Sequence, residues 1–191
     1  MTIFSTNSVS CFGCRAIFDA PVTHENCRIK TSINRLYSVS EYSECARRLI
    51  LSLKSEGMVG VATVMGRLMS ANLPLNDNYI ITYLPTASSR VQRRGFDQSR
   101  LLAREISKKT GCKNIKFLLR IGQTQQVGSS KIDRLSNISK AFRVTNKKLV
   151  KDAKILLVDD VLTTGATLQT AGQVLIDAGA KSVDAVVFAV A

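Results

Sequence analysis

The sequence predicts an α/β fold in which a parallel sheet is flanked by helices and carries a small N-terminal appendage. Short apolar, β-rich segments alternate with amphipathic segments over residues 41–190, a pattern typical of parallel strands connected by helices. Two close pairs of cysteine and histidine residues precede this region and indicate the appendage. We therefore expect residues 1–36 to form the appendage and residues 37–191 to form the sheet domain.

Length and composition exclude several protein classes. The chain has 191 residues, of which 45% are hydrophobic, enough for one domain with its own core. Every apolar run is shorter than the roughly 20 residues of a membrane span, which argues against a transmembrane helix. Residues 1–10 lack the basic and apolar regions of a signal peptide. We therefore expect a cytoplasmic protein whose five cysteines are thiols or metal ligands rather than disulfides.

The net charge of +13 is concentrated in one segment. Residues 90–151 hold 17 Lys and Arg but 3 Asp and Glu, whereas the rest of the chain holds 10 and 11. Such a surplus attracts polyanions, so the segment is either a binding surface for single-stranded DNA or a solvated surface that steers a small anion. Its aromatic residues are Phe96, Phe117 and Phe142, too few for an obvious base-stacking platform.

The appendage has the ligand spacing of a structural zinc site. Its C-x2-C-x9-H-x2-C pattern supplies four N and S ligands in two close pairs, as tetrahedral Zn2+ requires; these ligands are Cys11, Cys14, His24 and Cys27. Scattered thiols without a metal are the alternative. Cys45 falls in a predicted helix and Cys112 follows the predicted helix stop at Gly111, so both are interpreted as packing residues, although Cys45 could replace a ligand.

Two helices and a strand follow the appendage. Residues 41–54 and 58–69 each show an apolar stripe at helical spacing, and residues 79–84 read as a strand that ends at Pro85. The next residues form a loop of small and hydroxyl side chains with arginines close behind, and we expect it to be an anion site. Its candidate ligand-binding residues are Thr86, Ala87, Ser88, Arg90 and Arg94. The alternative is that these arginines belong only to the basic surface.

The remaining elements complete the alternation. Asp97 or Ser99 caps a helix that runs to residue 109, and Gly111 ends it. Residues 113–119 predict a short strand, and a polar stretch to residue 131 leads to a helix-like segment that includes Ala141 and Phe142. Residues 182–190 form a final apolar strand.

Residues 155–168 are the most informative part of the chain. Four apolar residues predict a strand buried on both faces; Asp159 and Asp160 follow at its carboxyl end, and a helix is expected over residues 167–178. Between them lies a loop whose backbone N–H groups and hydroxyls suit a phosphate: Thr163, Thr164, Gly165, Ala166 and Thr167. The two carboxylates suit ribose hydroxyls or a hydrated Mg2+. The chain has no Walker motif and no G-x-G-x-x-G motif.

This stretch resembles the phosphoribosyl pyrophosphate (PRPP) motif of type I phosphoribosyltransferases. The resemblance implies a type I phosphoribosyltransferase-like sheet, with Asp159 and Asp160 as catalytic residues that hold the ribose 2′- and 3′-hydroxyls and organise Mg2+. It also implies that residues 163–167 surround the 5′-phosphate of PRPP or of a nucleotide monophosphate. A leaving pyrophosphate would need a positive cradle such as the arginines after residue 89.

Further segments resemble the ComF family of phosphoribosyltransferase-like proteins. The matching positions are Arg93-Arg94-Gly95-Phe96-Asp97-Gln98 with Leu101-Leu102-Ala103, then Gln126, Arg134, Asn137 and Ala141-Phe142, together with Tyr42 and Lys54 in the helix after the finger. In the family the finger has two C-x2-C pairs, whereas the second pair here is His24 and Cys27. Asp97 stands where the family usually has Asn.

The ComF resemblance implies a role in DNA uptake during natural competence, beside a helicase-like partner. Two hypotheses follow. In the first, the protein is an enzyme that transfers phosphoribosyl from PRPP, with Mg2+, to an unknown acceptor. In the second, it is a non-catalytic accessory of DNA uptake that binds single-stranded DNA and the helicase-like partner. The intact acidic pair and loop favour retained ligand binding, whereas no acceptor pocket or general base stands out.

Overall fold

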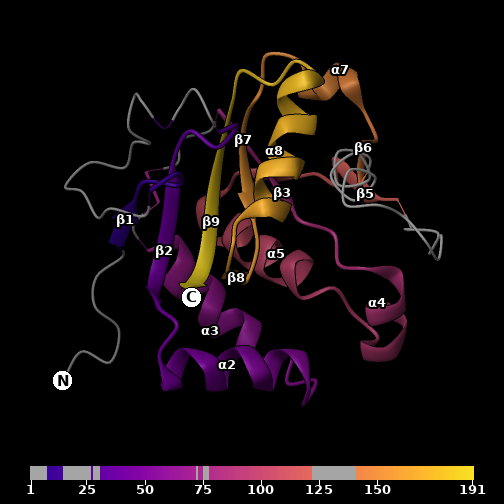
Figure 1. Cartoon of the computed structure of the whole chain (residues 1–191). Helices are drawn as coiled ribbons and strands as arrows, with labels where there is room; N and C mark the ends of the chain where they lie inside the picture. Colours follow the sequence, from indigo (N-terminus) through magenta and orange to yellow (C-terminus); the bar gives the residue numbers. More distant parts are fainter. Residues whose placement is uncertain (1–7, 15–26, 28–30, 72, 75–77, 122–140) are drawn as a thin grey trace, which may run out of the picture.

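The computed structural model describes residues 8–14, 27, 31–71, 73–74, 78–121 and 141–191. Their main sheet is seven-stranded in the order β1-β2-β9-β7-β3-β4, with β8 paired to the end of β9 (Figure 1). All these pairings are parallel except the antiparallel pair β1–β2. The strands are β1 Ser8–Ser10, β2 Leu36–Glu41, β3 Tyr79–Tyr83, β4 Lys113–Asn114, β7 Lys154–Val158, β8 Val161–Leu162 and β9 Ser182–Val190.

Helices cover both faces of the sheet, so the domain has three layers (Figure 1). Helices α2 (Glu44–Lys54), α3 (Val61–Ser70) and α5 (Gln98–Thr110) pack on one face. Helix α8 (Ala166–Asp177) and the hairpin of β5 (Leu118–Arg120) and β6 (Phe142–Val144) pack on the other. Two short helices, α4 (Ser88–Arg94) and α7 (Lys147–Val150), complete the described elements. None of the described helices is both long and apolar enough to cross a membrane.

Strand β9 shows why the sheet needs cover on both faces. Val183, Ala185 and Val187 belong to the core under α8, whereas Val186 and Phe188 belong to the core under α2, α3 and α5. Because side chains of a strand alternate between faces, an unbroken apolar run is buried only between two layers. The parallel α/β class that the sequence predicts is therefore confirmed.

Capping residues set the helix boundaries within this frame. Asp97 accepts from the backbone N–H groups of Ser99 and Arg100 and begins α5, as predicted. Ser43 caps α2 by accepting from the N–H of Ala46 at 3.3 Å. Helix α2 therefore starts at Glu44 rather than at residue 41, because Glu41 belongs to β2.

The structure corrects three local predictions and adds one strand. Residues 88–90 of the expected loop belong to helix α4, and residues 113–119 divide between two strands rather than forming one. Phe142 lies in strand β6, not in a helix, because it pairs with Arg120 of β5 and packs under that guanidinium, 5.5 Å from the ring centre. Strand β2 was not expected from the sequence, since Ser38 and Ser40 interrupt its apolar pattern; both are nevertheless buried.

Candidate functional site

The strand register brings the two predicted ligand loops to one edge of the sheet. Tyr83 of β3 lies opposite Val158 of β7, which in turn lies opposite Val186 of β9. The N–H of Leu84 donates to the carbonyl of Val158 at 2.9 Å and continues the pairing past the end of β3. The segment after β3 and the acidic pair after β7 therefore leave the sheet side by side, as expected at the carboxyl edge of a parallel sheet.

Strand β9 and helix α5 fix the acidic pair. The N–H of Asp159 donates to the carbonyl of Val186 at 3.0 Å, and the carbonyl of Asp160 accepts from the N–H of Phe188 at 3.0 Å. Asp159 Oδ1 accepts from the Ser99 hydroxyl and from the N–H of Asp160, both at 2.9 Å. Ser99 stands in the first turn of α5, so this helix aims the carboxylate of Asp159.

Asp160 is almost fully buried, with 4% of its surface exposed, and its Oδ2 is in ion-pair contact with the ammonium of Lys54. Lys54 is the last residue of α2, more than 100 positions earlier in the chain. The sequence offered no chemical reason to place Lys54 in this site, and only its match to the ComF helix singled it out. The protein itself thus supplies a cation, the ammonium of Lys54, to the acidic pair.

The pKa of Asp159 is raised to about 8, first by burial and then by the neighbouring charge of Asp160. Its hydrogen bonds from Asp160 and Ser99, and the charge of Lys54, act in the opposite direction. A protonated or hydrogen-bonded carboxyl in this position suits hydroxyl groups, which can both donate and accept. The arrangement is therefore compatible with a ribose diol at the acidic pair.

The predicted phosphate loop lies between β8 and α8. Gly165 adopts φ 80°, a left-handed conformation that glycine accepts without strain, and it is the N-cap of α8. Gly165 has no side chain to cap this helix, Thr164 Oγ1 accepts from the N–H of Ala166 at 3.4 Å, and the first turn holds no acidic residue. The helix begins at Ala166, one residue before the expected start, and Thr163, Thr164, Ala166 and Thr167 are exposed. A helix end of this kind favours an anion.

The second predicted loop is held by a carboxylate rather than left open. Asp97 Oδ2 accepts from the N–H of Thr86 at 2.9 Å, and Asp97 Oδ1 accepts from its hydroxyl at 3.2 Å. Asp97 thus anchors the loop and caps α5 at once. Ala87 is the N-cap of α4, and Ser88 and Arg90 lie in that helix, both exposed.

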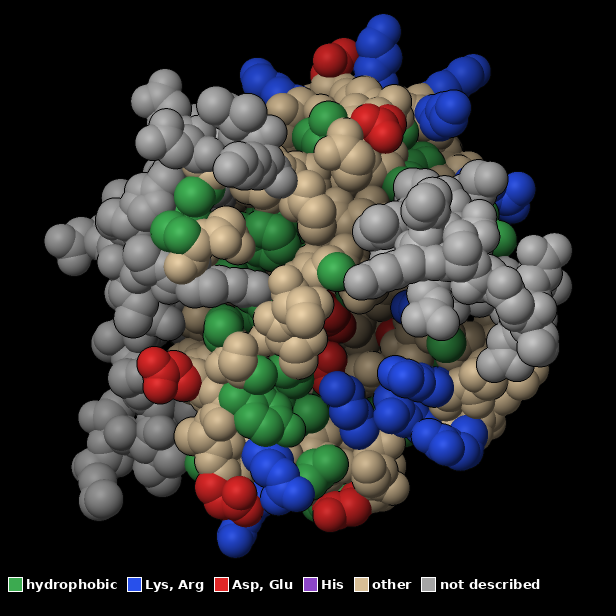
Figure 2. Space-filling view, in the orientation of Figure 1, with side chains coloured by type: hydrophobic (Ala, Val, Ile, Leu, Met, Phe, Trp, Pro, Cys, Tyr) green, Lys and Arg blue, Asp and Glu red, His purple; other side chains and the backbone are tan. Residues whose placement is uncertain are grey.

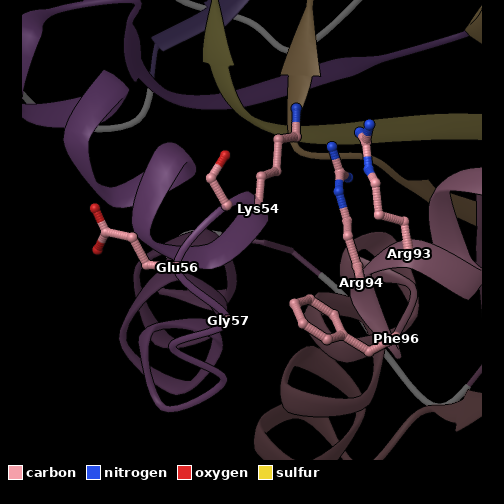
Figure 3. A pocket seen from close by; sticks show the side chains of 7 residues that line it. Lys54, Glu56, Gly57, Arg93, Arg94 and Phe96 are labelled. Carbon is pink, nitrogen blue, oxygen red and sulfur yellow. The ribbon is translucent and has the colours of Figure 1, made fainter.

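Cationic side chains line a hollow of about 410 Å³ beside the acidic pair (Figure 3). Lys54, Arg93, Arg94 and Phe96 line it, together with residues 55–57. Figure 3 shows the side chains of Lys54, Arg93 and Arg94 pointing the same way from two different elements. In the space-filling view, acidic side chains lie deep in a recess with lysine and arginine side chains next to it (Figure 2).

A second basic surface, which we call the edge groove, lies beyond strand β4. It consists of two adjoining hollows of about 290 and 340 Å³ that share Tyr83, Arg100 and Lys116. Arg104 lines one hollow and Arg120 the other, and all four cations are exposed. The carboxylate in its lining, Asp97, is already engaged by Thr86 and α5. The edge groove therefore presents a strongly positive surface.

Three of the four predicted zinc ligands lie together. The Sγ atoms of Cys11, Cys14 and Cys27 are all within 4.8 Å of one another, and His24 lies outside the described residues. Four ligands at about 2.3 Å from a tetrahedral zinc lie about 3.8 Å apart, so the spacing fits a metal site. Cys45 is in α2 and does not belong to the cluster, and Cys112 is buried in the core.

The cysteine cluster is packed tightly. A Cβ at Gly13 would lie 2.7 Å from the Cβ of Cys27, so only glycine permits this approach. Neighbouring Phe12 is buried in the core below α8, which ties the cluster to the sheet domain. As a thiol, Cys27 has its pKa raised to about 11 by desolvation and by its contacts with Cys11 and Cys14.

Comparisons with known proteins add a family context to this geometry. A family model described as "Phosphoribosyl transferase domain" matches residues 50–190. "DNA utilization protein YhgH" of Salmonella typhi is 34% identical over 161 residues, which cover 78% of this chain and 69% of that protein. "Competence protein ComFC" of Bacillus subtilis (strain 168) is 29% identical over 102 residues, 53% of this chain and 40% of that protein.

Among solved structures, the chain is similar to one described as "Structure of the allosteric regulatory enzyme of purine biosynthesis". The TM-score is 0.48 and the sequence identity is 18%. The likeness covers 66% of this chain and 25% of that one, so the chain spans about a quarter of its length.

The raised pKa of Asp159 predicts a pH-dependent effect of Asp159→Asn on stability. The folded protein holds a proton on Asp159 up to about pH 8, whereas the unfolded chain releases it near its ordinary pKa of 3.8. This group therefore destabilises the native state increasingly as pH rises through that window. Thermal unfolding without divalent cations should show Tm of Asp159→Asn rising relative to wild type between pH 5 and pH 8.

The matched control is Asp177→Asn, an exposed carboxyl at the end of α8. Its Tm difference from wild type should stay nearly constant with pH. An equally flat profile for Asp159→Asn would contradict the interpretation of Asp159 as a desolvated carboxyl.

Proposed function

This chain belongs to the ComF family of phosphoribosyltransferase-like proteins, and from that premise we propose that it binds a ribose 5-phosphate ligand with Mg2+. PRPP and nucleotide monophosphates are the two candidate ligands. The observation that carries the proposal is the fixed acidic pair of Asp159 and Asp160 beside the N-terminus of α8, whose N-cap is Gly165. The first suits a ribose diol and the second a 5′-phosphate.

The donor set also fits a divalent cation. Asp160 Oδ2 is buried and, within the described part of the chain, accepts no hydrogen bond of good geometry. Carboxylate oxygens are the ligands that Mg2+ prefers, and in the free protein the charge of this buried carboxylate is balanced by the ammonium of Lys54. Asp159 and Asp160 would hold Mg2+ directly or through water; when bound, it neutralises charge on the pyrophosphate group.

In the catalytic form of the proposal, the chain transfers phosphoribosyl from PRPP to an acceptor. The acceptor's nucleophilic atom bonds to C1 as the C1–O bond breaks, and pyrophosphate leaves with the electron pair; charge accumulates on its oxygens while C1 becomes oxocarbenium-like. The acidic pair would hold the ribose, residues 163–167 would hold the 5′-phosphate, and Arg93 and Arg94 would stabilise the leaving pyrophosphate. Such a site acts by orientation and electrostatic stabilisation.

Calorimetric titration with PRPP in the presence of Mg2+ tests this proposal. Wild type should bind with one site per chain, and Asp159→Asn combined with Asp160→Asn should weaken binding at least about tenfold. The reason is that charge-assisted hydrogen bonds to the ligand are worth about 1.5–3 kcal/mol each. Asp177→Asn should bind like wild type. Absence of binding by wild type to PRPP and to every nucleotide monophosphate tried would refute the proposal.

A second candidate function is an accessory role in DNA uptake, beside a helicase-like partner and through weak binding of single-stranded DNA. The relatives' names, DNA utilization protein and competence protein, support the biological context. The specific observation is the edge groove, whose four exposed cations lack free acidic neighbours in its lining. Arg120 already covers the Phe142 ring, which leaves little aromatic surface for stacking bases. Binding would therefore run through phosphates with little sequence preference.

Substitutions in the edge groove should weaken DNA binding across sequences. For Arg104→Ala with Lys116→Ala, fluorescence anisotropy with labelled oligonucleotides should show weaker binding and a shallower dependence on salt. Each lost phosphate contact lowers the slope of log K against log salt by about 0.7 for a single strand. Arg47→Ala with Arg48→Ala, on the exposed side of α2, is the control with the same charge change.

Competition distinguishes the edge groove from the ligand site. If the groove binds DNA, saturating PRPP leaves most of the DNA affinity intact. Complete displacement by PRPP, or no DNA binding even at low ionic strength, would argue that the basic segment serves the small ligand alone.

We also propose that the cysteine cluster holds one structural Zn2+ through Cys11, Cys14, His24 and Cys27. The described part of this set supports it by its spacing and by the close approach at Gly13. Zinc binds thiolates, so its binding must displace the thiol protons, and the affinity should fall as pH is lowered.

Elemental analysis of purified protein should give about one zinc per chain, and Cys14→Ser should lower that content. Cys112→Ser, a buried thiol away from the cluster, is the matched control. Zinc content near zero in wild type, or an equal loss in both variants, would contradict a zinc site in the appendage.

A further inference from the structure

Lys54 links two parts of the site that the sequence treats as separate. Its ammonium contacts the buried Oδ2 of Asp160, while its side chain also lines the cationic hollow with Arg93 and Arg94 (Figure 3). It is half-buried at the C-terminal end of α2. A single flexible side chain therefore borders both the acidic pair and the cationic hollow.

The contact with Asp160 carries a large share of the local charge balance. Asp160 Oδ2 is buried and accepts no well-formed hydrogen bond from the described residues, so an ionised Asp160 depends on Lys54. A buried charge that loses its partner is strongly destabilising. In the absence of ligand, the lysine therefore occupies the position at which a divalent cation would approach the same oxygen.

The hollow gives Lys54 a second place to bind. Arg93 and Arg94 line it from helix α4, and Arg94 donates to Gln98 Oε1 at 3.1 Å, which orients its guanidinium. The acidic residue in the lining, Glu56, is exposed at the rim of the loop after α2. A polyphosphate in this hollow would meet three cations once Lys54 turns toward it, and a lysine stem of four carbons allows that movement.

We propose that Lys54 is an exchangeable cation: it compensates Asp160 in the free protein and transfers to the ligand's pyrophosphate when a divalent cation takes its place at Asp160. This inference rests on the proposed function and adds a mechanism by which metal and pyrophosphate bind together. Metal at Asp160 releases the lysine, and the released lysine adds a charge to the anion site. The cooperativity follows from one side chain that cannot serve both partners at once.

The alternative is a permanent structural ion pair. In that case Lys54 stays on Asp160 whether ligand is bound or not, and the metal does not compete with it. Both interpretations expect a loss of stability when Lys54 is removed. They differ in how Mg2+ and pyrophosphate act on the variants.

Thermal unfolding with and without millimolar Mg2+ separates the two. Lys54→Met should lower Tm by about 5 °C or more, since it leaves Asp160 uncompensated. Mg2+ alone should then raise Tm of Lys54→Met clearly more than that of wild type, because the competing ammonium is gone. Lys54→Met with Asp160→Asn should regain stability and lose the Mg2+ response. Arg48→Met, which removes an exposed cation from the same helix, should behave like wild type.

Titration with inorganic pyrophosphate in Mg2+ provides the second readout. Lys54→Met should bind it about tenfold more weakly than wild type, and Lys54→Arg, which keeps the charge, should recover most of that affinity. Equal Mg2+ shifts of Tm in wild type and Lys54→Met, or equal pyrophosphate affinities, would overturn the exchange and leave a permanent pair. If Lys54→Met does not fold, Lys54→Gln, which is polar but uncharged, provides the same comparison of Mg2+ shifts and pyrophosphate affinities.

These outcomes are distinguishable from a failure of the proposed function. Wild type that binds no PRPP and no nucleotide monophosphate would refute the ligand assignment. The Mg2+ series on Tm needs neither ligand, so it still decides whether Lys54 and a divalent cation compete for Asp160.

Discussion

Two carboxylates stand next to each other where the central strand β7 leaves the sheet, and placing them there is costly because burial disfavours both charges. The surrounding structure offsets this cost from separate elements. Strand β9 holds their backbone, Ser99 of α5 donates to Asp159, and Lys54 of α2 pairs with Asp160. The acidic pair therefore constrains where one strand and two helices can lie, and each of them has a second role at the site.

The parallel register of the strands places the acidic pair next to the other loop of the ligand site. Because β3, β7 and β9 run in the same direction, the segments that follow β3 and β7 emerge at one edge. Asp97 also has two roles: it caps α5, and it holds Thr86 in the neighbouring loop. The N-terminus of α5 thereby positions one group in each of the two loops, Thr86 through Asp97 and Asp159 through Ser99.

Periodicity and capping predicted much of this arrangement. The apolar runs of β7 and β9 and the cap and stop of α5 are local signals, and the structure confirms them. Strand β2 escaped prediction because Ser38 and Ser40 are polar yet buried by pairing with β9, a contact about 150 residues distant in sequence. The role of Lys54 was not predicted for the same reason, since no residue near it in the chain indicates that it pairs with a carboxylate. Local sequence patterns predict individual helices and strands, whereas the site depends on contacts between elements that are far apart in the sequence.

The structure also divides the basic segment, which the sequence presents as one block. Arg93 and Arg94 leave α4 toward the hollow that Lys54 lines, whereas Arg104 and Lys116 face the edge groove beyond β4. A charge surplus counted along the chain cannot separate these surfaces, because helices α4 and α5 distribute neighbouring arginines to different sides. The question of whether the surplus serves a phosphate ligand or a nucleic acid is thus a question about two surfaces, and each can be altered without touching the other.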